Sequence, residues 1–425
     1  MQTIQYPERQ DWNEILRRPA MDTAALEARV ESILRDVQEN GDVALRRYTL
    51  QFDKTALDRI SVSESEFAGA EDQISEALKT AIGQAKSNIE KFHAAQRETS
   101  EVVETMPGVR CWRKSVPIDT VGLYIPGGTA PLFSTILMLG IPARLAGCRK
   151  IILCTPPDAN GKIHPAILYT AALTGITQVY KVGGVQAIAA MAFGTATISR
   201  VDKIFGPGNQ YVTCAKQLVN KAGTAIDMPA GPSEVAVLAD DSAVPAFVAA
   251  DLLSQAEHGA DSQVLLISTS PDLITRALKE VDQQLQALPR AQIAAQALSK
   301  SKAILVKDRT EAIDLVNQYA PEHLIISAEN DEQLADQVIN AGSVFLGNYS
   351  PESVGDYASG TNHTLPTNGH ARAYSGVSLD SFVRKITYQK LSFEGLAGIA
   401  SVVEEMAAAE GLQAHKNAVT IRKSN

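Results

Sequence analysis

The spacing of hydrophobic residues changes along the chain, first near residue 110. From about residue 24 to residue 105, apolar residues recur three and four positions apart with charges between them, as in residues 26–40 and 70–98. This spacing predicts amphipathic helices. From Cys111 onward, short β-branched runs alternate with helix-length segments. That alternation favours βαβ units and mostly parallel sheets.

The expected strands are too numerous for one comfortable sheet. The pattern therefore predicts an α/β fold with two Rossmann-like, doubly wound domains, one inserted in the other, plus small helical appendages at both ends. We expect chain breaks near Val121–Pro126 and at the Pro229–Pro232 turn. The strand pattern ends after about Gly376, and the remaining tail is predicted helical with a break at Gly411. The expected division is a helical arm at 1–23, a first α/β domain at 24–123 plus 233–375, an inserted NAD-binding α/β domain at 124–232, and a helical tail at 376–425.

Composition and charge narrow the class of protein. The chain has 425 residues, 45% of them hydrophobic and 20% charged, which is typical of globular proteins. Its net charge is −9 and it has no basic block, which disfavours nucleic acid as a partner. Charges throughout the first twenty residues argue against a secretory signal, and the uncharged stretch Thr120–Ala143 carries prolines and glycines that suit a buried segment better than a membrane span. We expect a cytoplasmic protein that does not bind membranes.

The cysteines give no sign of a metal or disulfide framework. Cys111, Cys148, Cys154 and Cys214 are far apart and form no CxxC pair. They are predicted to be small core residues in a reducing compartment.

Several polar residues near the second half of the chain are candidate ligands or bases. Gln255 and His258 stand three positions apart near the end of an expected helix, so both project from one face, although a polar last turn has the same pattern. Asp356 and His363 lie in a loop rich in glycine and serine, which is typical of a site but also of an ordinary turn. His415 lies in the tail, where Glu410 precedes it across Gly411.

The adjacent pair Glu322 and His323 leads directly into an expected strand, at a sheet edge. A carboxylate beside an imidazole supplies one group to activate water and another to move protons. Adjacent side chains usually face different ways, so a structural cap followed by an exposed histidine is the alternative.

Three glycine-containing turns follow expected strands and precede expected helices, at residues 123–132, 181–189 and 204–212. Free backbone N–H groups at such a position can receive a pyrophosphate. None of the turns matches G-x-G-x-x-G or the P-loop. Tight turns alone also explain them, so NAD binding stays open on this evidence.

Seven motifs together strongly resemble the histidinol dehydrogenase family, the last enzyme of histidine biosynthesis. In chain order they are VGLYIPGGTAPLFST, KIFGPGNQYV, DMPAGPSE, LLSQAEHG, YAPEHLI, VGDYASGTNHTLPT and GLQAHKNAV. The resemblance implies a zinc- and NAD-dependent oxidoreductase that converts L-histidinol through L-histidinal to L-histidine with two NAD. The cofactors it implies are one Zn²⁺ per subunit and NAD.

The resemblance also assigns residues. It implies Glu322 and His323 as the catalytic pair, with His323 accepting protons in both oxidations and Glu322 activating the water that adds to the aldehyde. The implied zinc ligands, which also meet the substrate together with His323, are Gln255, His258, Asp356 and His415. Further positions implied to contact or orient substrate are Ser233, Tyr357, His363 and Glu410. The implied NAD contacts are Tyr124, Gln186 and Asn209.

The resemblance further implies a homodimer in which the tail crosses over, so that Glu410 and His415 complete the partner's site. Two alternatives remain from the residues themselves. One is a zinc hydrolase whose metal-bound water is activated by Glu322. The other is a noncatalytic, metal-stabilised binding module. Within the family, a related dehydrogenase that acts on another alcohol is a third possibility.

Overall fold

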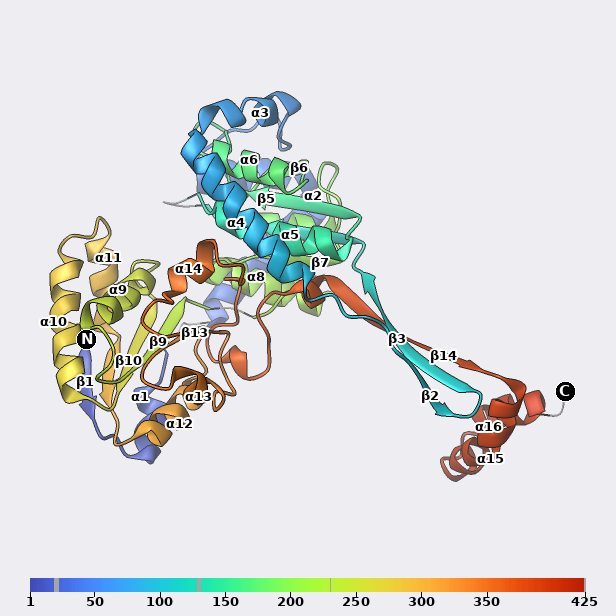
Figure 1. The fold of residues 1–425 in the computed structure, drawn as a ribbon. Helices are drawn as coiled ribbons and strands as arrows, with labels where there is room; N and C mark the ends of the chain where they lie inside the picture. Colours follow the sequence, from blue (N-terminus) through green and yellow to red (C-terminus); the bar gives the residue numbers. More distant parts are fainter. Residues whose placement is uncertain (19–22, 128–130, 230, 424–425) are drawn as a thin grey trace.

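The structure is a computed structural model that describes residues 1–18, 23–127, 131–229 and 231–423. The described chain forms two lobes, each built around a parallel sheet, and an arm that projects away from both (Figure 1). We call these the six-stranded lobe, the five-stranded lobe and the arm.

The six-stranded lobe holds a parallel sheet with the strand order β1-β11-β10-β9-β12-β13. Successive residues of β9 face opposite sides: Val235 and Val237 pack in one buried cluster, and Ala236 and Leu238 in another. Both sheet faces are therefore covered, as in doubly wound folds. The strands are β1 (Gln2–Gln5), β9 (Glu234–Ala239), β10 (Gln263–Ser268), β11 (Lys302–Leu305), β12 (His323–Ser327) and β13 (Ser343–Leu346). The helices are α1 (Trp12–Ile15), α9 (Pro245–Ala256), α10 (Pro271–Leu285), α11 (Ala291–Ser299), α12 (Arg309–Tyr319), α13 (Asp331–Ala335) and α14 (Glu352–Tyr357).

The five-stranded lobe has the parallel order β6-β5-β4-β7-β8. Its two faces are again covered by separate apolar clusters. Its strands are β4 (Thr120–Tyr124), β5 (Lys150–Thr155), β6 (Gln178–Lys181), β7 (Lys203–Phe205) and β8 (Ala225–Ile226). Its helices are α2 (Thr23–Tyr48), α3 (Glu64–Ala68), α4 (Glu76–Ala94), α5 (Phe133–Ala146), α6 (Pro165–Leu173), α7 (Gly184–Phe193) and α8 (Gln210–Lys221).

The arm combines segments from the middle and the end of the chain. Strand β3 (Val109–Pro117) pairs antiparallel with both β2 (Val102–Met106) and β14 (Val383–Leu391). Helices α15 (Phe393–Ala409) and α16 (Gln413–Lys423) follow β14 and form the tip of the arm (Figure 1). Gly411 between them has φ +72°, which explains the helix break expected there.

The predicted fold class is confirmed: the expected strands from residue 150 to residue 347 all form, and they divide between two parallel sheets. The predicted boundaries need correction. Residues 1–23 are not purely helical, because β1 pairs with β11 and adds an edge strand to the six-stranded sheet. Residues 24–123 do not join residues 233–375: α2 packs against α7 and α8, and β4 is the central strand of the five-stranded sheet. The break expected near Val121–Pro126 is therefore wrong.

The tail at 376–425 is not purely helical either, since β14 precedes its two helices. The expectation of helices up to residue 105 likewise missed β2. Both strands alternate little and are largely exposed in this chain, so hydrophobic periodicity gave no signal for them.

Two further expectations concern the surface and the cysteines. No helix among the described residues is long and apolar enough to cross a membrane. All four cysteines are free; Cys154 and Cys214 are buried, and the other two are half-buried.

Candidate active site

The predicted catalytic and ligand residues of the six-stranded lobe gather at the amino ends of its central strands. Glu322 immediately precedes β12, and His323 is its first residue, in register with Val235 of β9. Each helix that follows a parallel strand runs back across the sheet, so the ends of α9 and α14 return to the edge where the strands begin. Doubly wound folds usually bind ligands at the opposite, carboxyl edge.

Local backbone geometry delivers the pair to this edge. Helix α12 ends at Ala320, which has φ +53°, and Pro321 prevents the helix from continuing. Glu322 follows at once, and its Oε2 accepts a hydrogen bond from the backbone N–H of Glu234 at 2.8 Å. Nδ1 of His323 lies 3.2 Å from the carbonyl oxygen of Glu234. Because a carbonyl only accepts, Nδ1 carries the proton and Nε2 is the basic nitrogen.

Nε2 of His323 faces Asp356 of α14, whose Oδ1 is 3.3 Å away. The Nδ1 atom of His323 and Oε2 of Glu322 are 3.8 Å apart. Adjacent residues therefore do meet here, and the alternative of a cap with an exposed histidine is wrong: Glu322 is 6% and His323 3% exposed.

The expected ligands of α9 and α14 are also brought to this edge. Gln255 is fully buried, and neither of its side-chain amide atoms has a hydrogen-bond partner among the described residues. His258 lies just beyond the end of α9 and interacts electrostatically with Asp356, His323 and His363. Tyr357, next to Asp356, is 56% exposed. A buried amide left unpaired suits a ligand that the protein itself does not supply.

His363 is held by two partners. Its Nδ1 lies 2.8 Å from the backbone oxygen of Asp356, and its Nε2 lies 3.0 Å from Oγ1 of Thr135 on α5. It thus links the segment that carries Asp356 to the five-stranded lobe.

Glu352 is a residue of this site that the sequence analysis missed. It is 1% exposed, Oε1 accepts a hydrogen bond from Ser254 at 2.8 Å, and Oε2 lacks a partner in the described part of the chain. Glu352 stands four residues before Asp356 on α14, so helical spacing toward a known candidate was the available signal.

The electrostatics follow from burial of several acids around one imidazole. Burial raises the pKa of Glu322 to about 8 and that of Glu352 to about 7. Burial by itself lowers the pKa of His323, but the carboxylates of Glu322, Asp356 and Glu352 raise it to about 10. Three carboxyl groups surround one histidine, two of them buried and that of Asp356 partly buried, and such a site favours an added cation.

A cleft of about 750 Å³ lies between the two lobes, and of the candidate ligands and bases described above only His258 lines it. It is lined by Ser233 and His258 of the six-stranded lobe and by Asn209 of the five-stranded lobe. We call it the inter-lobe cleft.

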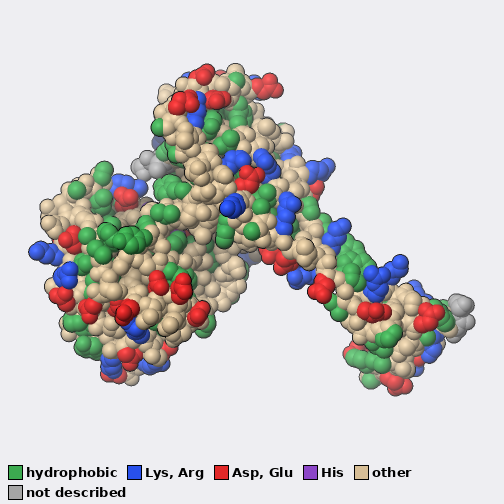
Figure 2. All heavy atoms as spheres, in the orientation of Figure 1, with side chains coloured by type: hydrophobic (Ala, Val, Ile, Leu, Met, Phe, Trp, Pro, Cys, Tyr) green, Lys and Arg blue, Asp and Glu red, His purple; other side chains and the backbone are tan. Residues whose placement is uncertain are grey.

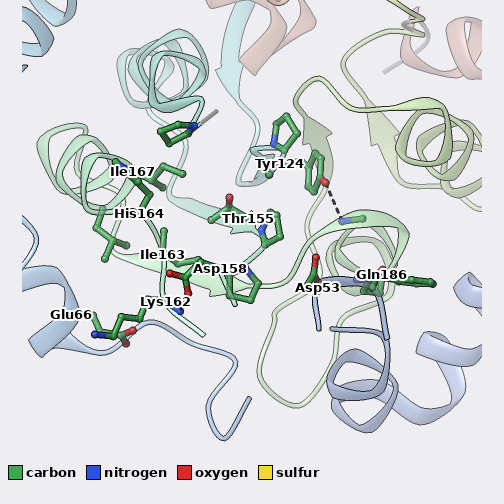
Figure 3. Close-up of a pocket in the computed structure, with 18 of the residues that line it drawn as sticks. Asp53, Glu66, Tyr124, Thr155, Asp158, Lys162, Ile163, His164, Ile167 and Gln186 are labelled. Carbon is green, nitrogen blue, oxygen red and sulfur yellow. Dashed lines mark hydrogen bonds between the residues drawn. The ribbon is translucent and has the colours of Figure 1, made fainter. Parts of the chain in front are cut away.

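A second cavity of about 1100 Å³ lies within the five-stranded lobe, and we call it the large cavity. Tyr124, Gln186 and Asn209, the expected NAD contacts, all line it, and Figure 3 shows the first two around it. The backbone N–H of Gly184, at the start of α7, donates to the hydroxyl oxygen of Tyr124 at 3.0 Å. Asn209 also lines the inter-lobe cleft, so it stands at both cavities.

A buried ion pair fixes the turn that carries Asn209. Lys216 contacts Asp227, donates to the carbonyl oxygen of Gly206 at 2.8 Å, and Asp227 accepts from the Gly206 N–H at 2.8 Å. Gly206 has φ +130°, and a Cβ there would collide with the backbone oxygen of Tyr124. This turn therefore requires glycine.

The structure does not bring Glu410 and His415 to the other candidates. Glu410 ends α15 and His415 lies on α16, both exposed at the tip of the arm, away from the lobes (Figure 1). In the described chain, no group of three or more His, Cys, Asp and Glu side chains is placed to hold a metal.

Comparison with known proteins adds the family. The histidinol dehydrogenase family model matches residues 16–423. The chain belongs to the histidinol dehydrogenase family. It is 61% identical to the histidinol dehydrogenase of Bacteroides thetaiotaomicron over 422 residues, which cover 99% of each chain. It is 52% identical to that of Escherichia coli K12 over 423 residues, covering 97% of this chain and 96% of the relative.

A crystal structure of histidinol dehydrogenase from Elizabethkingia anophelis superposes with a TM-score of 0.97 at 57% identity, covering 99% of this chain and 98% of the other. The family resemblance expected from the motifs is confirmed, and so is the prediction of an NAD-dependent oxidoreductase. Membership of this enzyme family argues against the alternative of a noncatalytic binding module.

Proposed function

We propose that the protein oxidises L-histidinol through L-histidinal to L-histidine, with two NAD and one Zn²⁺ per subunit. One observation carries the proposal. The buried pair Glu322 and His323 lies next to Asp356, at the same edge of the sheet as Gln255 and His258. A carboxyl group, an imidazole and several polar atoms without hydrogen-bond partners therefore lie together in a chain of the dehydrogenase family.

His323 is the base of both oxidations. The surrounding carboxylates raise the pKa of His323, so a bound cation that offsets their charge would leave the imidazole neutral. In that form its Nδ1 proton points to the carbonyl oxygen of Glu234, and Nε2 can take the hydroxyl proton of the substrate. When bound, NAD would supply the hydride acceptor of each oxidation. Glu322 removes a proton from the water that adds to the aldehyde, and burial strengthens its carboxylate as a base by raising its pKa. His323 gives up its first proton to solvent before the second oxidation and then takes the hydroxyl proton of the hydrate.

Zinc fits the side chains of this edge. Gln255, His258 and Asp356 supply oxygen and nitrogen donors, and the unpaired amide of buried Gln255 is the observation that favours a missing ligand. When bound, the ion would anchor the amine and imidazole of the substrate, as a zinc ion can when the protein ligands do not fill its coordination sphere. Ser233 lines the cleft on the same side, and Tyr357 adjoins Asp356.

The two cavities together would hold NAD. The nicotinamide must lie next to the substrate, which places it in the inter-lobe cleft with Ser233 and His258. Asn209 lines both cavities, so the dinucleotide can continue past it into the large cavity with Tyr124 and Gln186. Helix α7 begins at the large cavity without a side-chain cap, which suits a pyrophosphate.

The arm supports a homodimer in which the tail completes the partner's site. Only Gly395, Ala400 and Ala407 are buried in α15, so the tip has little core of its own. Figure 2 shows hydrophobic side chains along the arm and its tip. The most exposed of them are Val103, Phe393, Val402, Met406 and Ile421. A second copy that covers this surface brings His415 as fourth zinc ligand and Glu410 as a substrate contact, and His363 keeps Asp356 in place for it.

The test is the yield of NADH per molecule of L-histidinol consumed, before and after chelation and zinc re-addition. We expect two NADH per substrate, lost with the chelator and restored by zinc. Turnover of another alcohol but not of histidinol would leave a dehydrogenase with a different substrate. Zinc-dependent turnover without nicotinamide would support the hydrolase instead. The cytoplasmic location remains a prediction.

A further inference from the structure

The large cavity contains an acidic side chain that neither the motifs nor the proposed NAD contacts include. Asp53 lines it, at the end of a short π-helical turn (Thr49–Asp53) that follows α2. Figure 3 draws Asp53 among the lining residues together with Tyr124 and Gln186. Its charge acts on Tyr124, where it helps to raise the pKa of the phenol.

One carboxylate oxygen of Asp53 has no partner among the described residues. Its Oδ2 is buried and accepts no hydrogen bond from the described residues. Burial raises its pKa from the ordinary range to about 6. An unpaired buried carboxyl oxygen costs stability unless a ligand provides donors.

Two more lining groups share this condition. Oε1 of Gln186 and Oγ1 of Thr155 are also buried without a hydrogen-bond partner in the described chain. Both line the same cavity. The cavity thus offers several acceptors to one ligand, and a ligand rich in hydroxyl groups matches them.

The position of the cavity tells which half of NAD occupies it. None of the substrate-contacting candidates lines it, whereas Ser233 and His258 line the inter-lobe cleft. Because the nicotinamide must meet the substrate, the adenosine half extends past Asn209 into the large cavity. This step rests on the proposed function.

We propose that Asp53 accepts hydrogen bonds from the 2′- and 3′-hydroxyls of the adenosine ribose and thereby selects NAD over NADP. An acidic residue that meets the ribose 2′-hydroxyl is the usual device for NAD in dinucleotide folds. Here that acid comes from the segment after α2 and not from the end of a strand in the parallel sheet. A 2′-phosphate, with a charge of about −1.5 to −2, would face a carboxylate.

The cavity is also lined by two cationic side chains, Arg29 and Lys162, which could instead favour the 2′-phosphate of NADP. Arg29 lies over the ring of Tyr211, with 5.7 Å from its guanidinium carbon to the ring centroid. If these cations met the 2′-position, NADP would be tolerated and Asp53 would matter little. The experiment must therefore compare both nucleotides.

The experiment measures kcat/KM for NAD and NADP with L-histidinol, using the wild type, Asp53→Asn and Asp53→Ala. Asp58→Asn is the matched control, because Asp58 is exposed and outside the cavity and the variant makes the same change in net charge. Calorimetric binding of ADP-ribose and of its 2′-phosphate is measured in parallel, since it needs no turnover. Circular dichroism checks that each variant is folded.

Both Asp53 variants are expected to lower kcat/KM for NAD at least about tenfold through KM, because the loss of either of the two charge-assisted hydrogen bonds accounts for a factor of about ten. The kcat/KM for NADP should stay unchanged or rise in both Asp53 variants. Asp58→Asn should change kcat/KM for neither nucleotide. Equal losses with both nucleotides, or no loss in either variant, would overturn the role of Asp53. If the wild type oxidises no histidinol, the proposed function fails, while the binding of ADP-ribose against its 2′-phosphate still decides the role of Asp53.

Discussion

Arg18 joins the N-terminal segment to Glu234, the first residue of β9, whose backbone contacts both Glu322 and His323. Its Nε and Nη2 lie 2.5 and 2.8 Å from the two carboxylate oxygens of Glu234, and Nη2 also donates to the carbonyl oxygen of Tyr319 at 2.9 Å. The guanidinium carbon stands 4.0 Å from the ring centroid of Tyr319. The side chain of Glu234 is 3% exposed and that of Arg18 16% exposed.

Arg18→Met should therefore destabilise the protein strongly. The substitution keeps an apolar stem but leaves a buried carboxylate without its cation, which typically costs about 3–5 kcal/mol. The matched control is Arg17→Met, because Arg17 pairs with Glu14 at 3.3 Å with both side chains more than two-thirds exposed. Such a surface pair contributes about 0–1 kcal/mol.

The assay is urea unfolding, followed by far-ultraviolet circular dichroism and by tryptophan fluorescence. Arg18→Met is expected to lower the midpoint well below that of Arg17→Met. The double variant Arg18→Met with Glu234→Gln should lose less than the two single losses added, because it also removes the buried charge. Equal midpoints for Arg18→Met and Arg17→Met would refute the reasoning. Activity should fall as well, since the backbone of Glu234 holds both Glu322 and His323.

Three further outcomes follow from the site. Glu322→Gln should slow oxidation of histidinal more than that of histidinol, whereas His323→Asn should slow both; single-turnover NADH formation from each substrate checks this, and equal losses for Glu322→Gln would count against its role toward water. Asp356→Ala and His415→Ala should lower bound zinc together with activity, and a full zinc content by elemental analysis in either would remove that ligand. Asp53→Asn should raise the melting temperature of the nucleotide-free protein more at pH 8 than at pH 5: the pKa of Asp53 is raised to about 6 in the folded state, so stability is lost as pH rises through that value. A difference independent of pH would contradict this.

The sequence predicted the strands that are buried on both faces of a sheet. The runs at 234–239 and 263–268 are apolar on both faces because helices cover both sides of the sheet, so periodicity found them. Strand β14 is mostly exposed in this chain, and β1 has only four residues, so neither had an apolar pattern to detect. The division into domains failed for a different reason, because a helix such as α2 does not encode in its own pattern which sheet it will cover.

The candidate site divides in the same way. Glu322, His323, Gln255, His258 and Asp356 came from motifs, and chain reversal by α9 and α14 brings them to one edge. None of the seven motifs contains Asp53. That its side chain lines a cavity depends on how the segment after α2 lies in the five-stranded lobe, which the sequence pattern does not show. Glu352 was missed although it stands four residues before Asp356, because neither its helix nor its burial could be recognised from the sequence alone.

Subunit complementation tests the central claim most directly, that one chain's body and its partner's tail form a histidinol-oxidising site. His323→Asn is defective in the body and His415→Ala in the tail, so each homodimer should be nearly inactive. Co-expressed in equal amounts, about half of the dimers are mixed, and each mixed dimer regains one of its two sites, giving about one quarter of wild-type NADH formation from histidinol. Activity no higher than that of the two parents would contradict the account, because it would mean that His415 serves its own chain or no site at all.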